Sequence, residues 1–370
     1  MKIGIIGCGN ISAAYLRLGP MFKGVDITAV ADLDISAAQA RAEEFGVRAM
    51  SVEDLLGDAG IDAVVNLTIP AAHYEVTSNI LAAGKHAYSE KPLVLTLEEG
   101  TALAQKSAST GLRVGSAPDT FLGGAHQQAR AMIDAGELGE ITAGTAHVMG
   151  HGMEGWHPNP DFFFQPGAGP MLDIGPYYVT NLIQLLGPVA RVAALTSMAT
   201  PTRTIGSEPR KGEVIPVDTP TNIHALLEFA SGATITLSTS WDVWAHRHAN
   251  MELYGTGGSL FVPDPNFFGG TLERSGQSGD ISEVAAWDHP FGRANDGTRA
   301  NYRCAGLADM MQALDDGRDH RCSIELAVHA TEVMTGVLAS GEARQFVEMT
   351  TTCKRPEALG PDAAAALLSS

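Results

Sequence analysis

A chain of 370 residues is longer than one compact core of ordinary size, so its length predicts two domains. Hydrophobic residues make up 45% and charged residues 18% of the chain, which is the composition of a folded protein and excludes a disordered one. The formal net charge of −18 would repel a nucleic-acid backbone or an anionic membrane, so we expect neither as a partner.

Cysteine and histidine spacing predicts no metal site, and the N-terminal residues predict no targeting segment. The four cysteines are scattered without zinc-like or CxxC spacing. His246 and His248 alternate along an expected strand, but no third ligand accompanies them. The first residues are apolar only briefly, and no segment is long enough to span a bilayer. We therefore expect a cytoplasmic protein without a metal.

Short apolar runs alternate with helical patterns through the first third of the chain. Such alternation with short connections predicts a doubly wound parallel sheet, the Rossmann arrangement, with right-handed crossovers. The expected strands are residues 3–6, 27–31, 62–70 (running into a loop), 85–90 and 112–116, and the expected helices are residues 11–18, 36–45, 73–83 and 98–109.

The pattern changes after about residue 122, where alternating strand-like segments replace the buried runs. We expect a Rossmann domain over residues 1–122 and a substrate-binding and oligomerisation domain over residues 123–370, an α+β domain built on a mostly antiparallel sheet. The alanine-rich tail after Pro356 carries no predicted role. The expected strands are residues 142–148, 221–229, 233–240 and 249–254, and the expected helices are residues 182–186, 306–315 and 324–338.

A glycine-rich turn follows the first expected strand and opens the first expected helix. Gly7 allows the tight turn, and Gly9 lets the backbone approach a pyrophosphate at the positive end of the helix. Ser12 replaces the third glycine of the usual fingerprint, but it is small enough for close packing. This turn alone would be a weak indication of a dinucleotide site.

Asp32 strengthens that indication because it ends the second expected strand. There its carboxylate can accept hydrogen bonds from an adenosine ribose and would repel a ribose 2′-phosphate. No Arg or Lys follows it within the turn, so NAD is favoured over NADP; the alternative for Asp32 is a helix N-cap or a solvated acid. We expect the loop at Thr68 and Pro70 to lie beside the nicotinamide half. The full expected cofactor site is Gly7, Gly9, Asn10, Ile11, Asp32, Thr68, Pro70, His73, Glu90 and Lys91.

Glu90-Lys91-Pro92 ends a strand where ligands of a doubly wound sheet bind. With the preceding Gly84-Lys85-His86 and the later segment 169–178, this motif resembles the family of glucose–fructose oxidoreductase, inositol dehydrogenase and MocA, over nearly the whole chain. The resemblance implies a large open sheet in the C-terminal domain that builds a homodimer or homotetramer. It also implies a dehydrogenase acting on a sugar, glycoside or cyclitol.

Asp173 and Tyr177 are four residues apart at the start of an expected helix over residues 173–186, which would put them on one face. Many members of the family carry histidine at the second position, whereas this chain has tyrosine, as do the glucose–fructose oxidoreductase and dihydrodiol dehydrogenase branches. The departure makes Tyr177 the candidate acid/base. A neighbouring ammonium favours a phenolate, which Lys91 can supply, while Asp173 can orient the lysine or the substrate hydroxyl.

Each of these residues has a structural alternative. Lys91 could pair with Glu90 on the surface, Tyr177 could be a packed aromatic, and Asp173 could be an N-cap. Their occurrence together with the Glu-Lys-Pro motif favours catalysis. Trp156 and His157, in a loop rich in aromatics and prolines, are further substrate-binding candidates, although loop aromatics more often bury themselves.

Three functions remain open from the sequence. The first is a freely exchanging sugar, glycoside or cyclitol dehydrogenase, and the second is a glycosidase that retains NAD and uses transient oxidation, a chemistry found within the family. The third is a non-enzymatic dinucleotide-binding regulator. The presence of Lys91, Asp173 and Tyr177 argues against the regulator.

Overall fold

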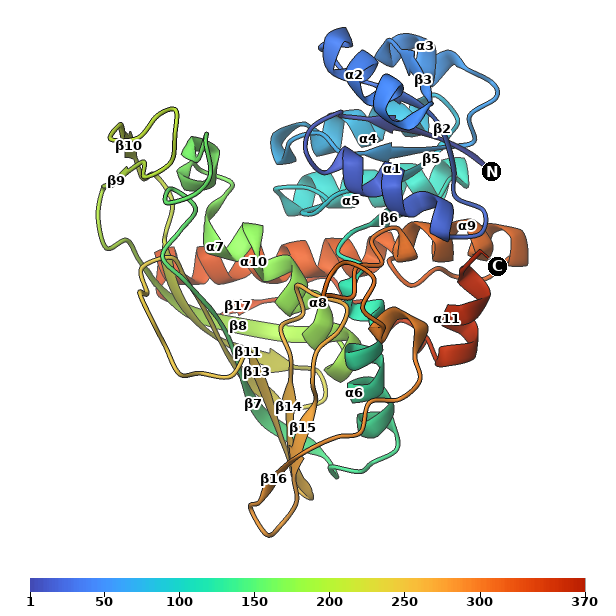
Figure 1. Ribbon diagram of the computed structural model, residues 1–370. Coiled ribbons are helices and arrows are strands. Elements are labelled where there is room, and N and C mark those ends of the chain that lie inside the picture. The colour runs from blue at the N-terminus through green and yellow to red at the C-terminus, as the bar shows by residue number, and fades with distance from the viewer. Residues whose placement is uncertain (370) are drawn as a thin grey trace.

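The computed structural model describes residues 1–369, which form two large sheets with their own helices (Figure 1). In those residues the first sheet has six strands in the order β3-β2-β1-β4-β5-β6, and every neighbouring pair is parallel. The order reverses at β1 and β4, where ligands of such sheets bind beyond the carboxyl ends of the strands. The predicted doubly wound parallel sheet is confirmed. Its strands are β1 (Lys2–Ile6), β2 (Asp26–Ala31), β3 (Arg48–Met50), β4 (Ala63–Asn66), β5 (His86–Ser89) and β6 (Val114–Ser116).

The strands of this sheet are apolar because helices cover it. Every residue of β4 is buried, and β1 is buried from Ile3 onward. Residues 48–57, for which the sequence patterns predicted no element, form β3 and the helix after it; none of the three β3 residues is buried, so the segment lacks an apolar run. The helices are α1 (Ser12–Leu18), α2 (Ile35–Phe45), α3 (Val52–Gly57), α4 (His73–Ala82) and α5 (Leu97–Thr110).

The second sheet is larger and mixed. Within the described chain it has nine strands in the order β16-β15-β14-β13-β7-β12-β11-β8-β17, and of these pairs β12 with β7 is parallel while the others are antiparallel. The predicted mostly antiparallel sheet is confirmed. Its strands are β7 (Ile141–Met149), β8 (Val189–Ser197), β11 (Asn222–Phe229), β12 (Thr234–Ser240), β13 (Met251–Gly255), β14 (Gly258–Val262), β15 (Glu273–Ser275), β16 (Ile281–Glu283) and β17 (Val347–Glu348), beside a separate hairpin of β9 (Thr202–Thr204) and β10 (Val214–Pro216).

Helices of the C-terminal half lie on one face of the second sheet and reach the first sheet (Figure 1). Every residue of α8 (Gly175–Leu186) is buried, and α10 (Ile324–Ala343) contacts β8 of the second sheet as well as α5 and β6 of the first.

The predicted boundary between residues 122 and 123 falls between η3 (Thr120–Leu122) and α6 (Gly124–Asp134) and stays a prediction. The helices are α6 (Gly124–Asp134), α7 (Gly169–Asp173), α8 (Gly175–Leu186), α9 (Ala305–Asp316), α10 (Ile324–Ala343) and α11 (Pro361–Leu367), and the short 3-10 turns are η1 (Gly19–Met21), η2 (Pro70–Ala72), η3 (Thr120–Leu122), η4 (Asp161–Phe164) and η5 (Pro290–Gly292). No helix in the part of the chain that the structure describes combines the length and apolar character that a bilayer crossing requires.

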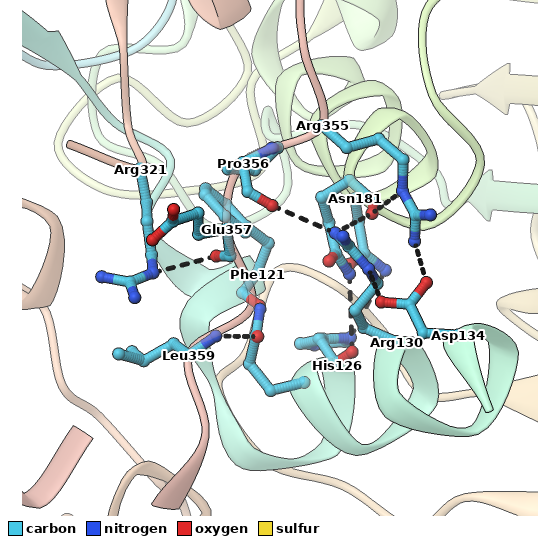
Figure 2. A network of polar contacts seen from close by, with 12 residues as sticks. Phe121, His126, Arg130, Asp134, Asn181, Arg321, Arg355, Pro356, Glu357 and Leu359 are labelled. Carbon is cyan, nitrogen blue, oxygen red and sulfur yellow. Dashed lines mark hydrogen bonds and ion pairs between the residues drawn. The ribbon is translucent and has the colours of Figure 1, made fainter. Parts of the chain in front are cut away.

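The C-terminal tail, which carried no predicted role, is bound to the protein by polar contacts (Figure 2). Arg130 on α6 donates to the carbonyl oxygens of Gln184 at 2.7 Å and Pro356 at 3.2 Å, and Arg355 pairs with Asp134 at 2.8 Å. The backbone N–H of Leu359 donates to the side chain of Gln127 at 2.7 Å. Because these contacts use backbone groups and separated arginines, no periodic pattern in the sequence indicates them.

His126 on α6 gives the fold a specific sensitivity to acid. Its ring is fully buried, with Nε2 2.8 Å from the Phe267 carbonyl oxygen and Nδ1 3.4 Å from the Asn181 amide (Figure 2 shows the second contact). Burial lowers the pKa of His126 to about 4, so the folded protein holds this ring neutral. The unfolded chain takes up the proton near the ordinary value of 6.5, so this contribution to stability is complete above pH 6.5 and is lost as the pH falls toward 4.

The free energy of unfolding of the unmodified protein falls between pH 6.5 and pH 4, and we predict that His126→Gln makes this fall smaller by up to about 3 kcal/mol. That figure is the free energy that corresponds to the difference between the folded and unfolded pKa values of His126. The variant loses stability at pH 7 because its contacts with Phe267 and Asn181 are weakened. Urea unfolding over this pH range measures both effects, with His246→Gln at an exposed position as the matched control. An unchanged pH slope in His126→Gln would contradict the assignment.

Candidate active site

The glycine loop after β1 leaves open the space that a dinucleotide needs. Gly7 has φ of +103°, and a Cβ there would lie 2.6 Å from the backbone of Leu67, so this position requires glycine. A Cβ on Gly9 would meet no atom of residues 1–369 within 4 Å. Asn10 is exposed and Ile11 is half-buried at the entry to α1. The residues of this loop therefore fit a close approach of a pyrophosphate.

Asp32 lies at the end of β2 beside that loop. Its Oδ2 accepts a hydrogen bond from the Cys8 backbone N–H at 2.7 Å, and its Oδ1 accepts one from the Asp34 N–H at 3.0 Å. The N-cap of α2 is Asp34, whose side chain accepts from the backbone of Ser36. The structure thus excludes the N-cap alternative for Asp32 and leaves its carboxylate at the mouth of the loop.

Arg41 is a residue of this region that the sequence analysis missed. Its Nε donates to the Ser12 hydroxyl at 3.1 Å and its Nη2 lies 3.4 Å from the Gly9 carbonyl oxygen, while that hydroxyl donates to the same oxygen at 2.6 Å. The turn after Asp32 itself holds no Arg or Lys. The helical path of α2 carries Arg41 back to the loop, so a cation does lie near the expected dinucleotide site.

The loops after β4 and β5 are joined by His73. Its Nδ1 lies 2.6 Å from the Pro92 carbonyl oxygen and its Nε2 lies 3.0 Å from the Thr68 carbonyl oxygen. The ring is buried, and burial lowers its pKa. His73 therefore links the segments that carry Thr68, Pro70 and Lys91 to one another, and its place in the cofactor site stays a prediction.

Lys91 joins the two halves of the protein. Its Nζ donates to the backbone oxygen of Asp173 at 2.7 Å and to Oδ1 of the same residue at 3.0 Å. The same nitrogen lies 5.3 Å from the centroid of the Tyr177 ring. Burial lowers the pKa of an ammonium, but Tyr177, Asp173 and Glu90 outweigh it, so the pKa of Lys91 is raised and the group stays charged. The three predicted catalytic residues are brought together.

The predicted continuous helix over residues 173–186 is wrong. α7 ends at Asp173, the chain turns at Ile174, and α8 begins at Gly175. Pro176 supplies no backbone N–H, so the hydrogen-bond ladder of a single helix would be interrupted at this point. Asp173 and Tyr177 therefore belong to different helices, and Asp173 is not an N-cap. They meet through Lys91 rather than through a shared helical face.

Glu90 lies at the centre of the site and its partners were not predicted. Its Oε1 accepts hydrogen bonds from the Tyr15 hydroxyl at 3.0 Å and from Arg303 Nη1 at 2.8 Å. Burial raises the pKa of Glu90, but Arg303 and Lys91 outweigh it, and the net shift is downward. Because Glu90 is buried and pairs with Arg303, the alternative of a surface pair between Glu90 and Lys91 is excluded.

Trp156 and His157 lie in a separate aromatic cluster before η4. The Trp156 side chain is 65% exposed, and the His157 ring packs edge-on against Phe162 and Phe163 with centroids 5.5 and 5.3 Å apart. Among the described contacts none joins them to the lysine site, so their substrate role stays a prediction. The described residues also contain no group of three His, Cys, Asp or Glu arranged to hold a metal ion.

A glycine loop, an acidic residue at the end of β2 and a switch in strand order define an oxidoreductase-type NAD-binding Rossmann domain. Comparison with protein families agrees: residues 1–117 match the model described as "Oxidoreductase family, NAD-binding Rossmann fold" and residues 126–261 match "GFO/IDH/MocA C-terminal domain". The chain belongs to the GFO/IDH/MocA oxidoreductase family. The resemblance inferred from the sequence and the expected NAD-binding domain are thereby confirmed.

Individual relatives are more distant. The chain is 33% identical over 150 residues to inositol 2-dehydrogenase/D-chiro-inositol 3-dehydrogenase of Lactiplantibacillus plantarum, covering 38% of this chain and 41% of that protein. It is 29% identical to 1,5-anhydro-D-fructose reductase of Ensifer adhaerens, covering 46% and 52%. It is 26% identical to scyllo-inositol 2-dehydrogenase (NAD(+)) of Bacillus subtilis, covering 71% and 73%. The matched segments thus span about half or less of the first two relatives.

Solved structures share the fold over nearly the whole chain. An NAD binding oxidoreductase from Klebsiella pneumoniae has a TM-score of 0.82 at 23% identity, covering 95% of this chain and 99% of that one. A levoglucosan dehydrogenase has a TM-score of 0.82 at 21% identity, with the same coverage. These likenesses extend the fold assignment to both domains.

We predict that Asp32→Ala lowers the preference for NADH over NADPH by roughly tenfold, because it removes a ribose acceptor and a charge that repels a 2′-phosphate. Fluorescence titration with both cofactors measures the ratio of dissociation constants. Asp26→Ala, at the exposed start of the same strand, is the matched control. A ratio that does not change would remove Asp32 from the site.

Proposed function

We propose that the protein is an NAD-dependent dehydrogenase that transfers a hydride between nicotinamide and a secondary hydroxyl of a sugar, glycoside or cyclitol. The observation that carries the proposal is the convergence of Lys91, Asp173 and Tyr177 from two domains. The relatives support the substrate class, since they are named for inositols and an anhydro sugar. A levoglucosan dehydrogenase of the same fold was solved with NADH and levoglucosan.

In this proposal the first domain holds the cofactor. Gly7 and Gly9 leave room for the pyrophosphate, and the Asp32 carboxylate accepts hydrogen bonds from the ribose hydroxyls. The loop at Thr68 and Pro70 lies beside the nicotinamide. Asn10, Ile11, His73 and Glu90 complete the proposed cofactor site. When bound, the nicotinamide accepts or supplies the hydride.

Proton transfer falls to this chain's own side chains. Tyr177 takes the hydroxyl proton as the alcohol becomes a carbonyl, and returns it in the reverse direction. The Lys91 ammonium, 5.3 Å from the Tyr177 ring centroid, stabilises both the phenolate and the negative charge that develops on the substrate oxygen. Asp173 holds the ammonium in place through Oδ1, and the second carboxylate oxygen, Oδ2, can accept a hydrogen bond from a substrate hydroxyl.

We further propose that the protein is a homodimer or homotetramer through the second sheet. Along β11 the buried residues alternate with Leu226, which is 47% exposed on the opposite side. Leu195 on β8 and Phe346 before β17 are each 66% exposed. Exposed apolar side chains on these neighbouring strands support the C-terminal sheet as the contact surface.

We predict that Lys91→Ala lowers kcat by a factor on the order of 10² to 10⁴, because the proton-transfer site loses its positive charge, while NADH affinity changes little. Stopped-flow and steady-state rates measure the first effect, and fluorescence titration measures the second. Lys211→Ala, on the exposed loop between β9 and β10, is the control and retains full activity. Undiminished turnover in Lys91→Ala would refute the assignment.

The experiment that tests the function itself is a screen of the purified protein with NAD and NADP against monosaccharides, glycosides and inositols. The dehydrogenase proposal predicts a rise in nicotinamide absorbance equal to the substrate consumed, and its loss in Tyr177→Phe. Cleavage of a glycoside without net reduction would instead identify an NAD-retaining glycosidase. Cofactor binding without turnover on any of these alcohols would contradict the proposal.

A further inference from the structure

Arg303 comes from a distant part of the chain into the centre of the active site. Its Nη1 pairs with Glu90 at 2.8 Å although 213 positions separate the two residues. Glu90 is directly followed by Lys91, and its Oε2 accepts the Lys91 backbone N–H at 3.1 Å. One buried carboxylate therefore connects the Arg303 guanidinium to the backbone of the residue that carries the site's ammonium.

The backbone beside Arg303 is held in an unusual conformation. Cys304 has φ of +91°, a region that residues other than glycine rarely adopt. Asp119 compensates for this, because its Oδ2 accepts the backbone N–H groups of Cys304 at 3.2 Å and Gly306 at 3.1 Å. Burial raises the pKa of Asp119 to about 6. These two hydrogen bonds hold the backbone directly after Arg303 in place, at the start of α9.

Arg303 has more hydrogen-bond donors than its pairing with Glu90 uses. A guanidinium has five N–H donors, and Nη1 alone pairs with Glu90 among the described residues. The side chain keeps 21% of its surface exposed, so its remaining edge faces accessible space. Burial lowers the pKa of Arg303, but Glu90 and then Tyr177 outweigh it and raise the pKa.

We propose that Arg303 is a positioning residue of the proton-transfer site. Its ion pair with Glu90, whose other oxygen accepts the Lys91 backbone N–H, fixes the loop that bears Lys91 and so holds the ammonium beside the Tyr177 ring. This assignment rests on the proposed function, since it places Arg303 in the acid/base step described above. The charged and titratable groups around the Arg303–Glu90 pair are Tyr15 from α1, His73 at the start of α4, Tyr88 on β5, Lys91 after β5, Asp119 before η3, Asp173 at the end of α7, Tyr177 on α8 and Cys304 before α9.

The test is the pH dependence of kcat/KM for oxidation of the alcohol found in the screen, measured for three variants. Arg303→Gln removes the charge, Arg303→Lys keeps the charge without the planar fork, and the double variant Glu90→Gln/Arg303→Gln removes the ion pair as a whole. Arg299→Gln, on the same segment but exposed, is the matched control and leaves the profile unchanged. Thermal unfolding of each variant verifies that it is folded.

We expect Arg303→Gln to move the rise of kcat/KM to higher pH by about one unit, because the Lys91 ammonium is no longer held where it stabilises the Tyr177 phenolate. We also expect a fall in kcat with little change in KM. Arg303→Lys restores most of the profile, and the double variant remains displaced. If Arg303→Gln does not fold, the pH profiles of the double variant and of Arg303→Lys still test whether the ion pair acts on the proton transfer.

Two results would overturn the proposal. A wild-type profile in the double variant would mean that Arg303 does no more than neutralise Glu90. A raised KM with unchanged kcat and unchanged profile in Arg303→Gln would mean that Arg303 contacts substrate without acting on the proton transfer. Failure of the proposed function is a separate outcome, because it would show in the unmodified protein as cofactor binding without any alcohol-dependent reduction of nicotinamide.

Discussion

The hydrogen-bonded ion pair between Lys91 and Asp173 is the interaction on which the active site depends. Lys91 follows the fifth strand of the parallel sheet, whereas Asp173 ends a helix of the second domain, 82 positions later. A buried ammonium is costly unless a carboxylate and further acceptors compensate for its lost hydration. Asp173 supplies both a carboxylate oxygen and a backbone oxygen. The site therefore forms when the two domains pack against each other.

Several other contacts keep that packing in place. α10 contacts both sheets, and the last residues of α11 return to the first domain, where the Leu367 carbonyl oxygen accepts the Lys23 N–H at 2.8 Å. Within the first domain, the side chain of Asn66 donates to the His73 carbonyl oxygen at 3.1 Å and to Thr77 at 3.0 Å. The loops after β4 and β5 are thus held by buried polar groups, which fixes the conformation of their backbone.

Local patterns in the sequence predicted much of the architecture. The buried strands, the glycine turn and Asp32 follow from local order along the chain, because a strand, a turn and a helix are contiguous. Lys91, Asp173 and Tyr177 were found because a resemblance linked segments that no local pattern connects. The break at Ile174 was missed because Pro176 was assigned to the first turn of a helix that begins at Asp173. Pro176 instead lies in the first turn of a separate helix, α8, which begins at Gly175.

Other features were beyond prediction for a physical reason. Arg303 is a single arginine in an irregular segment, and its importance arises from a buried partner more than two hundred positions away. Arg41 is one of several polar residues on α2, and nothing in the local sequence indicates that its side chain contacts the glycine loop. The tail from Pro356 onward binds through backbone carbonyl and N–H groups, which carry no residue-specific signal. Contacts of these kinds depend on the three-dimensional path of the chain.

A crystal structure of the protein with NADH and a bound sugar or cyclitol tests the convergence of Lys91 and Tyr177 on the substrate most directly. We expect the reacting oxygen to lie within hydrogen-bond distance of both Tyr177 Oη and Lys91 Nζ, with the ammonium still bound to Asp173. A complex in which the amine and the phenol point into bulk water, or in which the alcohol binds away from them, would contradict it.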